Sequence, residues 1–510
     1  MKKLLSIFTS RLFVVAVLIL LQLVFMMSLV YQAGVLNRKI NFFFLILSYL
    51  MVVYIINKEG NPSFKVAWCI IILVLPVFGG IFYLLFGDKK VPKALQKTML
   101  NSIQKTIPLL SQNQDILTEL KKTNYEAYKE SSYVWFNTYF PVYQRTETTY
   151  FKVGEEKYAK LIEELKKAKS FIFMEYFIVE EGEFWNSVLQ ILEEKVKEGV
   201  LVRFMYDDAG CVSKLDPHYK KTLERKGIEC AVFNPIKAQL VIQMNNRDHR
   251  KITVIDNQVG FVGGINLADE YINKVVRFGH WKDTAVMLKG EAVWSLTVMF
   301  LQFWNYVDKE KNINFLKFKL PVEEEIESDG FVQPFSDSPT DNEEAGLNVH
   351  MNMINNAKEY IYIHTPYLVI GYEMHKALTL AAKSGVDVRI VCPYIPDKWY
   401  VHWVTQSNYL PLINHGVKIY EYKPGFIHSK SIVCDDEIGI CGTINMDYRS
   451  YYLHYECGVL LYNCKTLKTM KEDFLQTLNV CVEITKEDCK NTFFLKKIIQ
   501  AMLNFFAPLM

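Results

Sequence analysis

Three long uncharged stretches dominate the first 87 residues of the chain. Arg11 and Arg38 bracket 26 residues without a charge, and two further uncharged stretches cover 40–57 and 66–87. A helix rises about 1.5 Å per residue, so roughly 20 apolar residues cross the hydrocarbon layer of a membrane. The first and third stretches are long enough for this, and the second is marginal. The pattern predicts a transmembrane region over residues 1–87 with two to three apolar helices.

A cleaved signal peptide is the alternative interpretation of the first stretch. The apolar region of a signal peptide has only about 7–15 residues, and further apolar segments do not normally follow it directly. We therefore favour an uncleaved anchor. Pro76, Gly79 and Gly80 interrupt the third stretch, which predicts a kinked or re-entrant segment. If the three stretches cross the membrane, nearly equal numbers of basic residues lie on its two sides. The positive-inside rule therefore does not decide the orientation.

Beyond a polar connector over 88–135, strand-like apolar runs alternate with helical patterns, and the same order occurs twice. The first half has strand-like runs at 171–179, 198–208 and 226–234, with a helical pattern at 184–197. The second half has corresponding runs at 360–370, 384–393 and 415–423, with a helical pattern at 372–383. The predicted fold class is α/β with two similar domains. The short strand–helix–strand spacing favours mainly parallel sheets.

An acidic, turn-rich stretch over 321–344 separates the two halves. Its composition is typical of a linker, and its Ser- and Asp-rich end could fold back on a functional site. The sequence therefore predicts a first domain over 136–320, a linker over 321–344 and a second domain over 345–510.

Composition and charge narrow the possible functions. Half of the 510 residues are hydrophobic, which is ample for a large core and argues against disorder. The net charge is +3, but beyond residue 86 there are 51 basic and 54 acidic residues. A slightly acidic body argues against a general nucleic-acid binder, which needs a basic face. The ten cysteines form no C-x-x-C pair, which argues against a zinc ribbon and favours a reducing compartment.

One motif occurs once in each half, with the pattern H-x-K-x4-D-x6-G-[GT]-x-N. Its polar residues are His249, Lys251, Asp256 and Asn266 in the first half, and His428, Lys430, Asp435 and Asn445 in the second. The same long spacing in both copies, inside a repeat, is far from chance. The doubled motif is therefore the candidate site.

These residue types suit phosphoryl transfer. Residues i and i+2 of a strand face the same way, so the histidine and lysine of each motif project together. A neutral imidazole can attack phosphorus, and an ammonium beside it can hold the phosphate oxygens. Two such strands meeting across a pseudo-twofold axis would place two histidines on opposite sides of one phosphorus. One would attack and the other would protonate the leaving alkoxide, an in-line displacement that needs no metal.

The remaining polar residues have supporting roles in this hypothesis. Asn266 and Asn445 follow Gly turns and could donate hydrogen bonds to the phosphate. Asp283 and Glu456 lie on later apolar strands and are candidates to orient the second nitrogen of each histidine. Asp256 and Asp435 come at strand ends, where forming a turn or an ion pair is as plausible as contact with substrate.

The doubled motif resembles that of the phospholipase D superfamily and, within it, bacterial cardiolipin synthases. Further similarities are the segments at 76–87, 245–252, 263–271, 333–343, 365–367 and 504–510. The resemblance implies two phospholipase D-like domains related by pseudo-twofold symmetry, preceded by membrane helices. It also implies a membrane-bound phosphatidyltransferase with its catalytic domains at the cytoplasmic face. Thr443, where the first copy has Gly264, and the extra apolar N-terminal segment depart from the commonest pattern.

The reaction implied by the resemblance uses two phosphatidylglycerol molecules. One histidine attacks the first, glycerol leaves, and the resulting phosphatidyl-histidine passes its phosphatidyl group to the second, giving cardiolipin. The catalytic roles fall on His249, Lys251, His428 and Lys430, with Asp256 and Asp435 completing the motifs. No metal or cofactor is implied. The sequence does not decide which histidine is the nucleophile.

Other functions remain open at this level. A phospholipase D-type hydrolase or nuclease, a transferase with a different acceptor alcohol, and a non-catalytic membrane scaffold would share much of the sequence. The partners expected here are phosphatidylglycerol and the bilayer, and no nucleic acid. The final helical pattern at 493–506 has an apolar face that suits either a membrane interface or packing on the second domain. No pattern indicates an oligomeric state.

Overall fold

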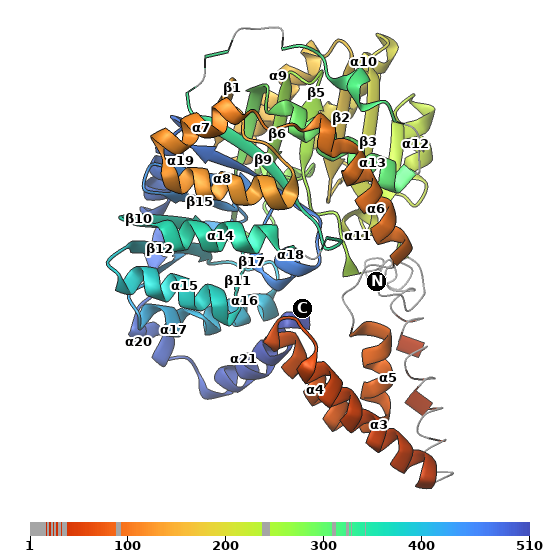
Figure 1. Cartoon of the computed structure of the whole chain (residues 1–510), viewed down its shortest axis with the longest axis vertical. Coiled ribbons are helices and arrows are strands. Elements are labelled where there is room, and N and C mark those ends of the chain that lie inside the picture. Colours follow the sequence, from red (N-terminus) through yellow and green to blue (C-terminus); the bar gives the residue numbers. More distant parts are fainter. Residues whose placement is uncertain are drawn as a thin grey trace.

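The computed structural model describes residues 38–87, 93–236, 245–308, 313–322, 326–327, 329–341 and 343–509, with scattered positions between 17 and 32. Two similar halves stack on each other, and a group of apolar helices projects from one end beside the C-terminus (Figure 1). Apart from the scattered positions, the first predicted apolar stretch lies outside the described residues.

Each half is built on one large sheet, and the two sheets have the same strand order. The first sheet contains, in spatial order, β1 (Thr146–Phe151), β8 (Ala285–Gly290), β6 (Val259–Gly263), β5 (Ile252–Ile255), β2 (Phe171–Tyr176), β3 (Leu201–Asp207) and β4 (Glu229–Phe233). The second contains β9 (Phe331–Asp337), β18 (Glu456–Tyr462), β16 (Ile438–Gly442), β15 (Ser431–Cys434), β10 (Tyr360–His364), β12 (Asp387–Pro393), β13 (Lys418–Tyr422) and the additional edge strand β19 (Cys481–Glu483).

The prediction of mainly parallel sheets is wrong. Only β2, β3 and β4, and their counterparts β10, β12 and β13, run parallel. The other neighbours in both sheets are antiparallel. Three-residue turns at 256–258 and 435–437 join β5 to β6 and β15 to β16, and Asp256, Asn257, Asp435 and Asp436 within them all have positive φ. Turns this short connect antiparallel strands, whereas the other antiparallel pairs join strands that are far apart in the chain.

Helices flank both sheets (Figure 1). In the first half they are α9 (Gly154–Lys167), α10 (Glu183–Lys197), α11 (Asp208–Cys211), α12 (Tyr219–Arg225) and α13 (Val293–Asp308). In the second half they are α14 (Ala345–Asn356), α15 (Tyr372–Lys383), α16 (Trp399–Ser407), α17 (Tyr409–Ile413), α18 (Tyr448–Tyr452), α19 (Thr466–Leu478), α20 (Lys486–Lys490) and α21 (Phe494–Phe506).

One apolar core runs through both halves. Val286 and Leu288 of β8 belong to the same buried cluster as Ile440 of β16 and Val459 of β18. The two sheets therefore pack against each other, and β6 and β8 contact β16 and β18 directly. Burying a continuous core in this way fixes the relative position of the two motif-bearing strands, β5 and β15.

Both segments predicted as connecting regions contain regular structure. Residues 331–337, inside the predicted linker, form β9 and pair with β18 at the edge of the second sheet. An edge position tolerates Pro334, which lacks an N–H for a second neighbour. The connector residues form α6 (Lys93–Thr106), α7 (Gln114–Thr123) and the start of α8 (Tyr125–Thr138).

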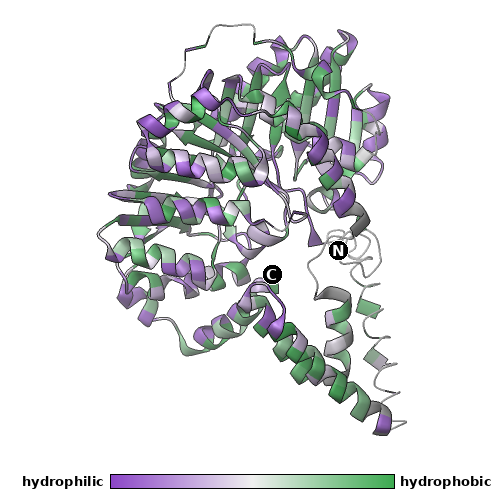
Figure 2. Cartoon of the chain, viewed as in Figure 1, coloured by the Kyte–Doolittle hydropathy of each residue, from purple (hydrophilic) through white to green (hydrophobic). Residues whose placement is uncertain are grey.

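The N-terminal apolar helices are α3 (Arg38–Asn57), α4 (Pro62–Val74) and α5 (Pro76–Phe86), and Figure 2 shows that they consist mostly of hydrophobic residues. The third predicted stretch is broken after Leu75, because Pro76 cannot donate the hydrogen bond that would continue the helix. Among the described residues, no helix combines the length and the apolar content needed to cross a membrane.

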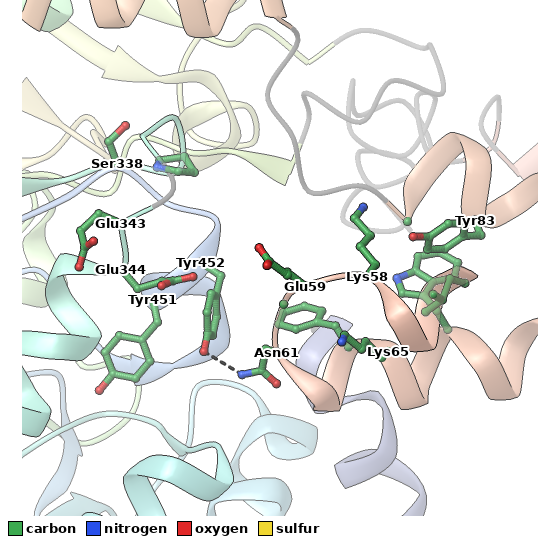
Figure 3. A pocket seen from close by; sticks show the side chains of 16 residues that line it. Lys58, Glu59, Asn61, Lys65, Tyr83, Ser338, Glu343, Glu344, Tyr451 and Tyr452 are labelled. Atoms are coloured by element: carbon green, nitrogen blue, oxygen red, sulfur yellow. Dashed lines mark hydrogen bonds between the residues drawn. The ribbon is translucent and has the colours of Figure 1, made fainter. Parts of the chain in front are cut away.

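These helices contact the second domain through α4 and α18. The Phe64 ring packs edge-on against Tyr448 and Tyr452, with ring centroids 5.6 and 5.5 Å apart. The Asn61 side chain donates to the Tyr452 hydroxyl at 2.8 Å, and the Tyr448 hydroxyl donates to Ser63 at 3.2 Å. A pocket of about 230 Å³ lies beside this contact, between the N-terminal helices and the second domain (Figure 3).

Candidate active site

Each H-x-K segment pairs with a segment of the opposite half. The residues around His249 run into β5, and the His249 N–H donates to the Tyr455 carbonyl at 2.9 Å, next to Glu456. In the second half, β14 (Gly425–Ile427) pairs in parallel with β7 (His280–Lys282). The His428 N–H then donates to the Lys282 carbonyl at 2.7 Å, next to Asp283. The backbone therefore brings each histidine to a carboxylate from the other domain.

The side chains complete these two pairs. His249 Nδ1 lies 2.9 and 3.0 Å from the two Glu456 oxygens, and His428 Nδ1 lies 2.6 Å from Asp283 Oδ2. Both carboxylates are completely buried. A carboxylate accepts a hydrogen bond from Nδ1–H, so each contact favours the tautomer whose Nε2 lone pair is available for chemistry.

The difference between Gly264 and Thr443 has a structural reason. A Cβ at Gly264 would lie 2.1 Å from Asp283 Oδ1, so the first copy has no space for a side chain there. At the equivalent place in the second copy, the Thr443 hydroxyl donates to Glu456 at 2.5 Å, and Ser450 donates to the other Glu456 oxygen at 2.7 Å. The threonine that replaces glycine in the second motif thus helps to hold the Glu456 carboxylate in place.

Both histidines line one cavity of about 560 Å³, together with Asn266 and Asn445. Asn266 is held by two contacts, since its oxygen accepts from the Ile178 N–H at 2.9 Å and its amide donates to the Tyr271 hydroxyl at 2.8 Å. The two H-x-K segments therefore converge on a single space, as an in-line displacement requires.

The motif lysines lie behind the histidines and, like the motif aspartates, are not among the residues that line the cavity. Lys251 and Lys430 are buried, and each ammonium donates to the carbonyl of the histidine two residues before it. Burial lowers the pKa of Lys251 to about 8 and that of Lys430 to about 7, while Asp283 and Glu456 act in the opposite direction on both. Lys251 also lowers the pKa of Lys430, because the two positive charges repel each other.

Burial also keeps both imidazoles neutral. It is the largest cause that lowers the pKa of His249 well below its usual value and that of His428 to about 4, and nearby lysines add to it. A neutral imidazole is the form that can attack phosphorus or accept a proton. At neutral pH the free site therefore holds both histidines in the form that can attack phosphorus or accept a proton, and a histidine that protonates a leaving oxygen must first gain a proton.

These pKa shifts predict the pH dependence of the reaction. We expect kcat/KM to fall as pH rises through about 7–8, because Lys430 and then Lys251 lose the positive charge that would hold the phosphate. On the acidic side, we expect activity to persist until His428 protonates near pH 4. The measurement is kcat/KM from pH 4 to 10, and a rate that rises steadily from pH 7 to 9 would contradict the role of the lysines.

Asp256 and Asp435 do not line the cavity, and their contacts support the turn-forming alternative. Asp256 accepts from the backbone N–H groups of residues 169–171 at 2.6–2.8 Å. Asp435 accepts from those of residues 358–360 at 2.7–2.9 Å. Each carboxylate thus ties the end of its motif strand to the start of the neighbouring strand.

Asp256→Ala is expected to reduce stability far more than catalysis. The change removes an acceptor for three N–H groups and places alanine at a φ of +52°, so we expect a loss of about 3 kcal/mol. Thermal unfolding measures the loss, and kcat per folded molecule should change less than about threefold. Asp256→Asn, which keeps one acceptor oxygen and tolerates this φ, should be milder. A large loss of kcat with unchanged stability would contradict this assignment.

Several residues around the cavity carried no clear signal in the sequence. Aromatic rings hold the imidazoles, with Phe177 centred 5.2 Å from His249 and Trp281 centred 5.3 Å from His428. His454 lies beside His249, with ring centroids 5.5 Å apart. Lys157 is a third buried lysine, whose ammonium donates to the Ile265 carbonyl at 3.1 Å and whose pKa burial lowers to about 7. Their proximity to the motifs arises only through folding.

One set of side chains among the described residues has the spacing of a metal site. The ligand atoms of His249, His454 and Glu456 lie within 4.8 Å of one another. The Glu456 carboxylate, however, already faces His249 and accepts from the Thr443 and Ser450 hydroxyls. The set fits a hydrogen-bonded histidine–carboxylate pair better than a free ligand set.

Comparison with known proteins shows to which family the chain belongs. A family model described as "Cardiolipin synthase, PLD-like domain" matches residues 161–293 and 351–478, one match in each half. A cardiolipin synthase of Alkalihalophilus pseudofirmus is 35% identical over 463 residues, covering 90% of this chain and 91% of that protein. The chain belongs to the cardiolipin synthase family. The resemblance inferred from the doubled motif and the α/β fold with two phospholipase D-like domains are confirmed.

This member of the cardiolipin synthase family is also similar to other proteins. An uncharacterised protein of Streptococcus mutans is 43% identical over 460 residues, covering 90% of this chain and 99% of that protein. A model described as "Phospholipase_D-nuclease N-terminal" matches residues 46–87. The crystal structure of a Haemophilus influenzae phosphatidylserine synthase has a TM-score of 0.56 at 14% identity, covering 74% of this chain and 97% of that one, which shows a shared fold.

Proposed function

We propose that this chain is a phosphatidyltransferase that makes cardiolipin and glycerol from two molecules of phosphatidylglycerol. The proposal rests above all on the two neutral histidines in one cavity, each held at Nδ1 by a buried carboxylate. Membership of the cardiolipin synthase family supports the choice of lipid substrate. The catalytic roles we propose are those of His249 and His428, with Lys251 and Lys430 holding the phosphate and Asp283 and Glu456 orienting the imidazoles.

The proposed reaction has two displacements at one phosphorus. In the first, the Nε2 lone pair of one histidine forms a bond to phosphorus, the bond to the headgroup glycerol breaks, and the other histidine gives its Nε2 proton to the leaving oxygen. The bound phosphodiester anion offsets the burial that otherwise disfavours this proton. In the second, a hydroxyl of another phosphatidylglycerol gives its proton to that histidine, attacks phosphorus and displaces the first imidazole. Both displacements are reversible.

The direct test supplies the purified full-length chain with phosphatidylglycerol vesicles and no other lipid. Cardiolipin and free glycerol should appear in equal amounts, because each transfer releases one glycerol. Phosphatidic acid as the only lipid product would indicate a hydrolase. A new phospholipid formed only when another alcohol or lipid is added would indicate a different acceptor.

We also propose that the enzyme works at a membrane surface, and α21 supports this. Its polar side faces the protein, since Lys496 donates to Gln406 at 2.7 Å and Gln500 donates to the Trp403 carbonyl at 3.1 Å. Its apolar side faces outward, with Phe494 73% and Met502 62% exposed. A helix that packs on a protein in water shows the opposite arrangement. We propose that this face and the apolar helices α3–α5 contact lipid.

Charged residues on this face should impair action on a bilayer. For the double variant Phe494→Glu and Met502→Glu, we expect a severalfold lower initial rate on vesicles and an unchanged rate in detergent micelles, where the substrate reaches the site from solution. Glu487→Gln with Lys490→Gln, on the adjacent short helix α20, is the control. Equal losses in vesicles and micelles would indicate a structural role for the face.

We further propose that the catalytic domains lie at the cytoplasmic side of the membrane. All ten cysteines of the chain are free thiols, and seven of them are buried. Free thiols persist in a reducing compartment, whereas oxidising compartments favour disulfides.

A further inference from the structure

Cationic side chains gather at one end of the cavity, beside His249. They are Arg247, Arg449 and Lys398, of which Arg449 contacts His454, while the Lys398 ammonium lies 5.4 Å from the centroid of the Tyr367 ring. Burial is the main cause that holds the pKa of His454 well below its usual value, and all three cations lower it further. These residues are not part of either motif, so the chemistry at phosphorus does not account for them.

The cations at this end are less well neutralised than those at the other end. Near His428, Lys214 and Arg277 both contact the Glu270 carboxylate, at 3.5 and 3.0 Å. Among the described residues, no ion pair within 4 Å involves Arg449, although the nearby Asp447 acts to raise the pKa of its guanidinium. Its side chain donates to His454 Nε2 at 3.1 Å and to the Asn245 carbonyl at 3.5 Å.

Arg247 and Lys398 have only weak acidic partners. The buried Arg247 guanidinium donates to the Asn234 carbonyl at 2.8 Å and reaches Asp207 at 3.4 Å. Burial raises the pKa of Asp207 to about 7, which weakens its charge. Lys398 lies 3.6 Å from Asp397, which already accepts from the Tyr367 hydroxyl at 2.6 Å.

The remaining acid at this end, Asp447, is committed to the fold. It accepts from the Ser450 N–H at 2.8 Å and caps the N-terminus of α18. His454 offers no spare donor to the cavity. A guanidinium only donates, so His454 Nε2 is the acceptor and Nδ1 carries the proton, but Nδ1 is buried and lies 3.8 Å from Glu456 Oε1. This end of the cavity therefore offers an anion the donors of Arg247, Lys398 and Arg449, three cations that outnumber the nearby carboxylates Asp397 and Asp447.

We propose that Arg247, Lys398 and Arg449 bind the phosphodiester of the acceptor lipid, separately from the phosphate that reacts. This inference rests on the proposed function. Joining two phosphatidylglycerol molecules brings two phosphates into one cavity, and the motif residues hold only the reacting one. Guanidinium groups suit the second because they bind phosphate oxygens with paired, charge-assisted hydrogen bonds.

The position of this subsite also assigns the two histidines. An acceptor hydroxyl must approach phosphorus opposite to the bond that breaks, and its own phosphate lies on the same side. Because the cationic subsite adjoins His249, that histidine accepts the hydroxyl proton at Nε2. The new P–O bond then forms as the bond between phosphorus and His428 Nε2 breaks. His428 is thus the residue that carries the phosphatidyl group.

The first experiment compares two reactions of the same full-length enzyme. Cardiolipin synthesis needs a phosphate-bearing acceptor, whereas exchange of radiolabelled glycerol into phosphatidylglycerol uses an acceptor without one. For Arg449→Gln we expect kcat/KM for cardiolipin synthesis to fall about 10–100-fold, and glycerol exchange to change less than about threefold. Lys398→Gln changes a half-exposed side chain that the fold does not require. It should also lower cardiolipin synthesis more than glycerol exchange, with a smaller loss of kcat/KM than in Arg449→Gln.

The outcomes are distinguishable. The control is Arg145→Gln, which removes the charge of a surface side chain far from the motif residues in sequence. The Arg145 side chain is 72% exposed and pairs with Glu291, so this variant should affect neither reaction. A parallel loss of both reactions in the Lys398 and Arg449 variants, or no loss in either, would overturn the subsite. If the unmodified enzyme performs neither cardiolipin synthesis nor glycerol exchange, the proposed function itself fails.

The second experiment identifies the histidine that carries the phosphatidyl group. The enzyme is mixed with labelled phosphatidylglycerol, quenched in alkali, digested and analysed by mass spectrometry. The label is expected on the peptide that contains His428. In the variant Asp283→Asn we expect that peptide to carry no label, because Asp283 holds the His428 imidazole. Label on His249 would overturn the assignment.

Discussion

Replacing either His249 or His428 by alanine is expected to lower kcat for cardiolipin formation by at least about 10⁴-fold. One imidazole supplies the bond to phosphorus and the other supplies and removes a proton, so neither displacement proceeds without both. Because the two side chains share one cavity, we expect the double variant to be no worse than the single ones. Initial rates with phosphatidylglycerol in detergent micelles measure the effect independently of membrane binding.

The control for this prediction is His218→Ala, which removes an exposed histidine and should leave the rate unchanged. The two alanine variants should also remain folded, because each removes a ring at a cavity wall without adding bulk. Retention of more than a few per cent of the rate in either variant would show that the histidine concerned is not in the reaction path.

Replacing Asp283 by Asn, or Glu456 by Gln, is expected to cost about 10²–10⁴-fold in kcat. The amide can present an N–H to the imidazole, which favours the tautomer with the proton on Nε2 and removes the lone pair needed for chemistry. The shapes of the side chains are nearly unchanged, so the loss should appear in kcat more than in KM. Steady-state rates over a range of phosphatidylglycerol concentrations separate these parameters.

A matched control is Asp473→Asn, which changes another buried carboxylate that faces no histidine. Asp473 accepts from Lys282 at 2.8 Å and from the Tyr150 hydroxyl at 3.1 Å. We expect it to lower thermal stability while kcat of the folded enzyme stays within about threefold. If the Asp283 and Glu456 variants resemble this control, the carboxylates serve the fold and not the imidazoles.

The exchange of carboxylates between the halves has a further consequence. Neither half contains a complete histidine–carboxylate pair, because Glu456 holds the histidine of the first domain and Asp283 holds that of the second. The backbone bridges from Tyr455 to the His249 segment and from β7 to β14 fix this arrangement. The two domains therefore form one active site together, and a shared apolar core keeps them in register.

The sequence by itself determined the repeat, the α/β class and the candidate residues for the chemistry. His249 and Lys251, like His428 and Lys430, are close in the chain, and their spacing alone places them together. The β4 and β13 strands and the helices α10 and α15 were likewise visible in local apolar patterns. Local spacing could not reveal the antiparallel halves of the sheets, since these depend on which strands pair.

Only the tertiary structure decided what each remaining residue does. It joined Asp283 to His428 and Glu456 to His249, contacts across 145 and 207 residues that no local pattern specifies. It turned Asp256 and Asp435 toward backbone N–H groups, and it gathered Arg247, Arg449 and His454 beside the motif. The physical reason is that a hydrogen bond between distant residues forms only after the apolar cores bring their strands together, so its partners are set by packing and not by sequence spacing.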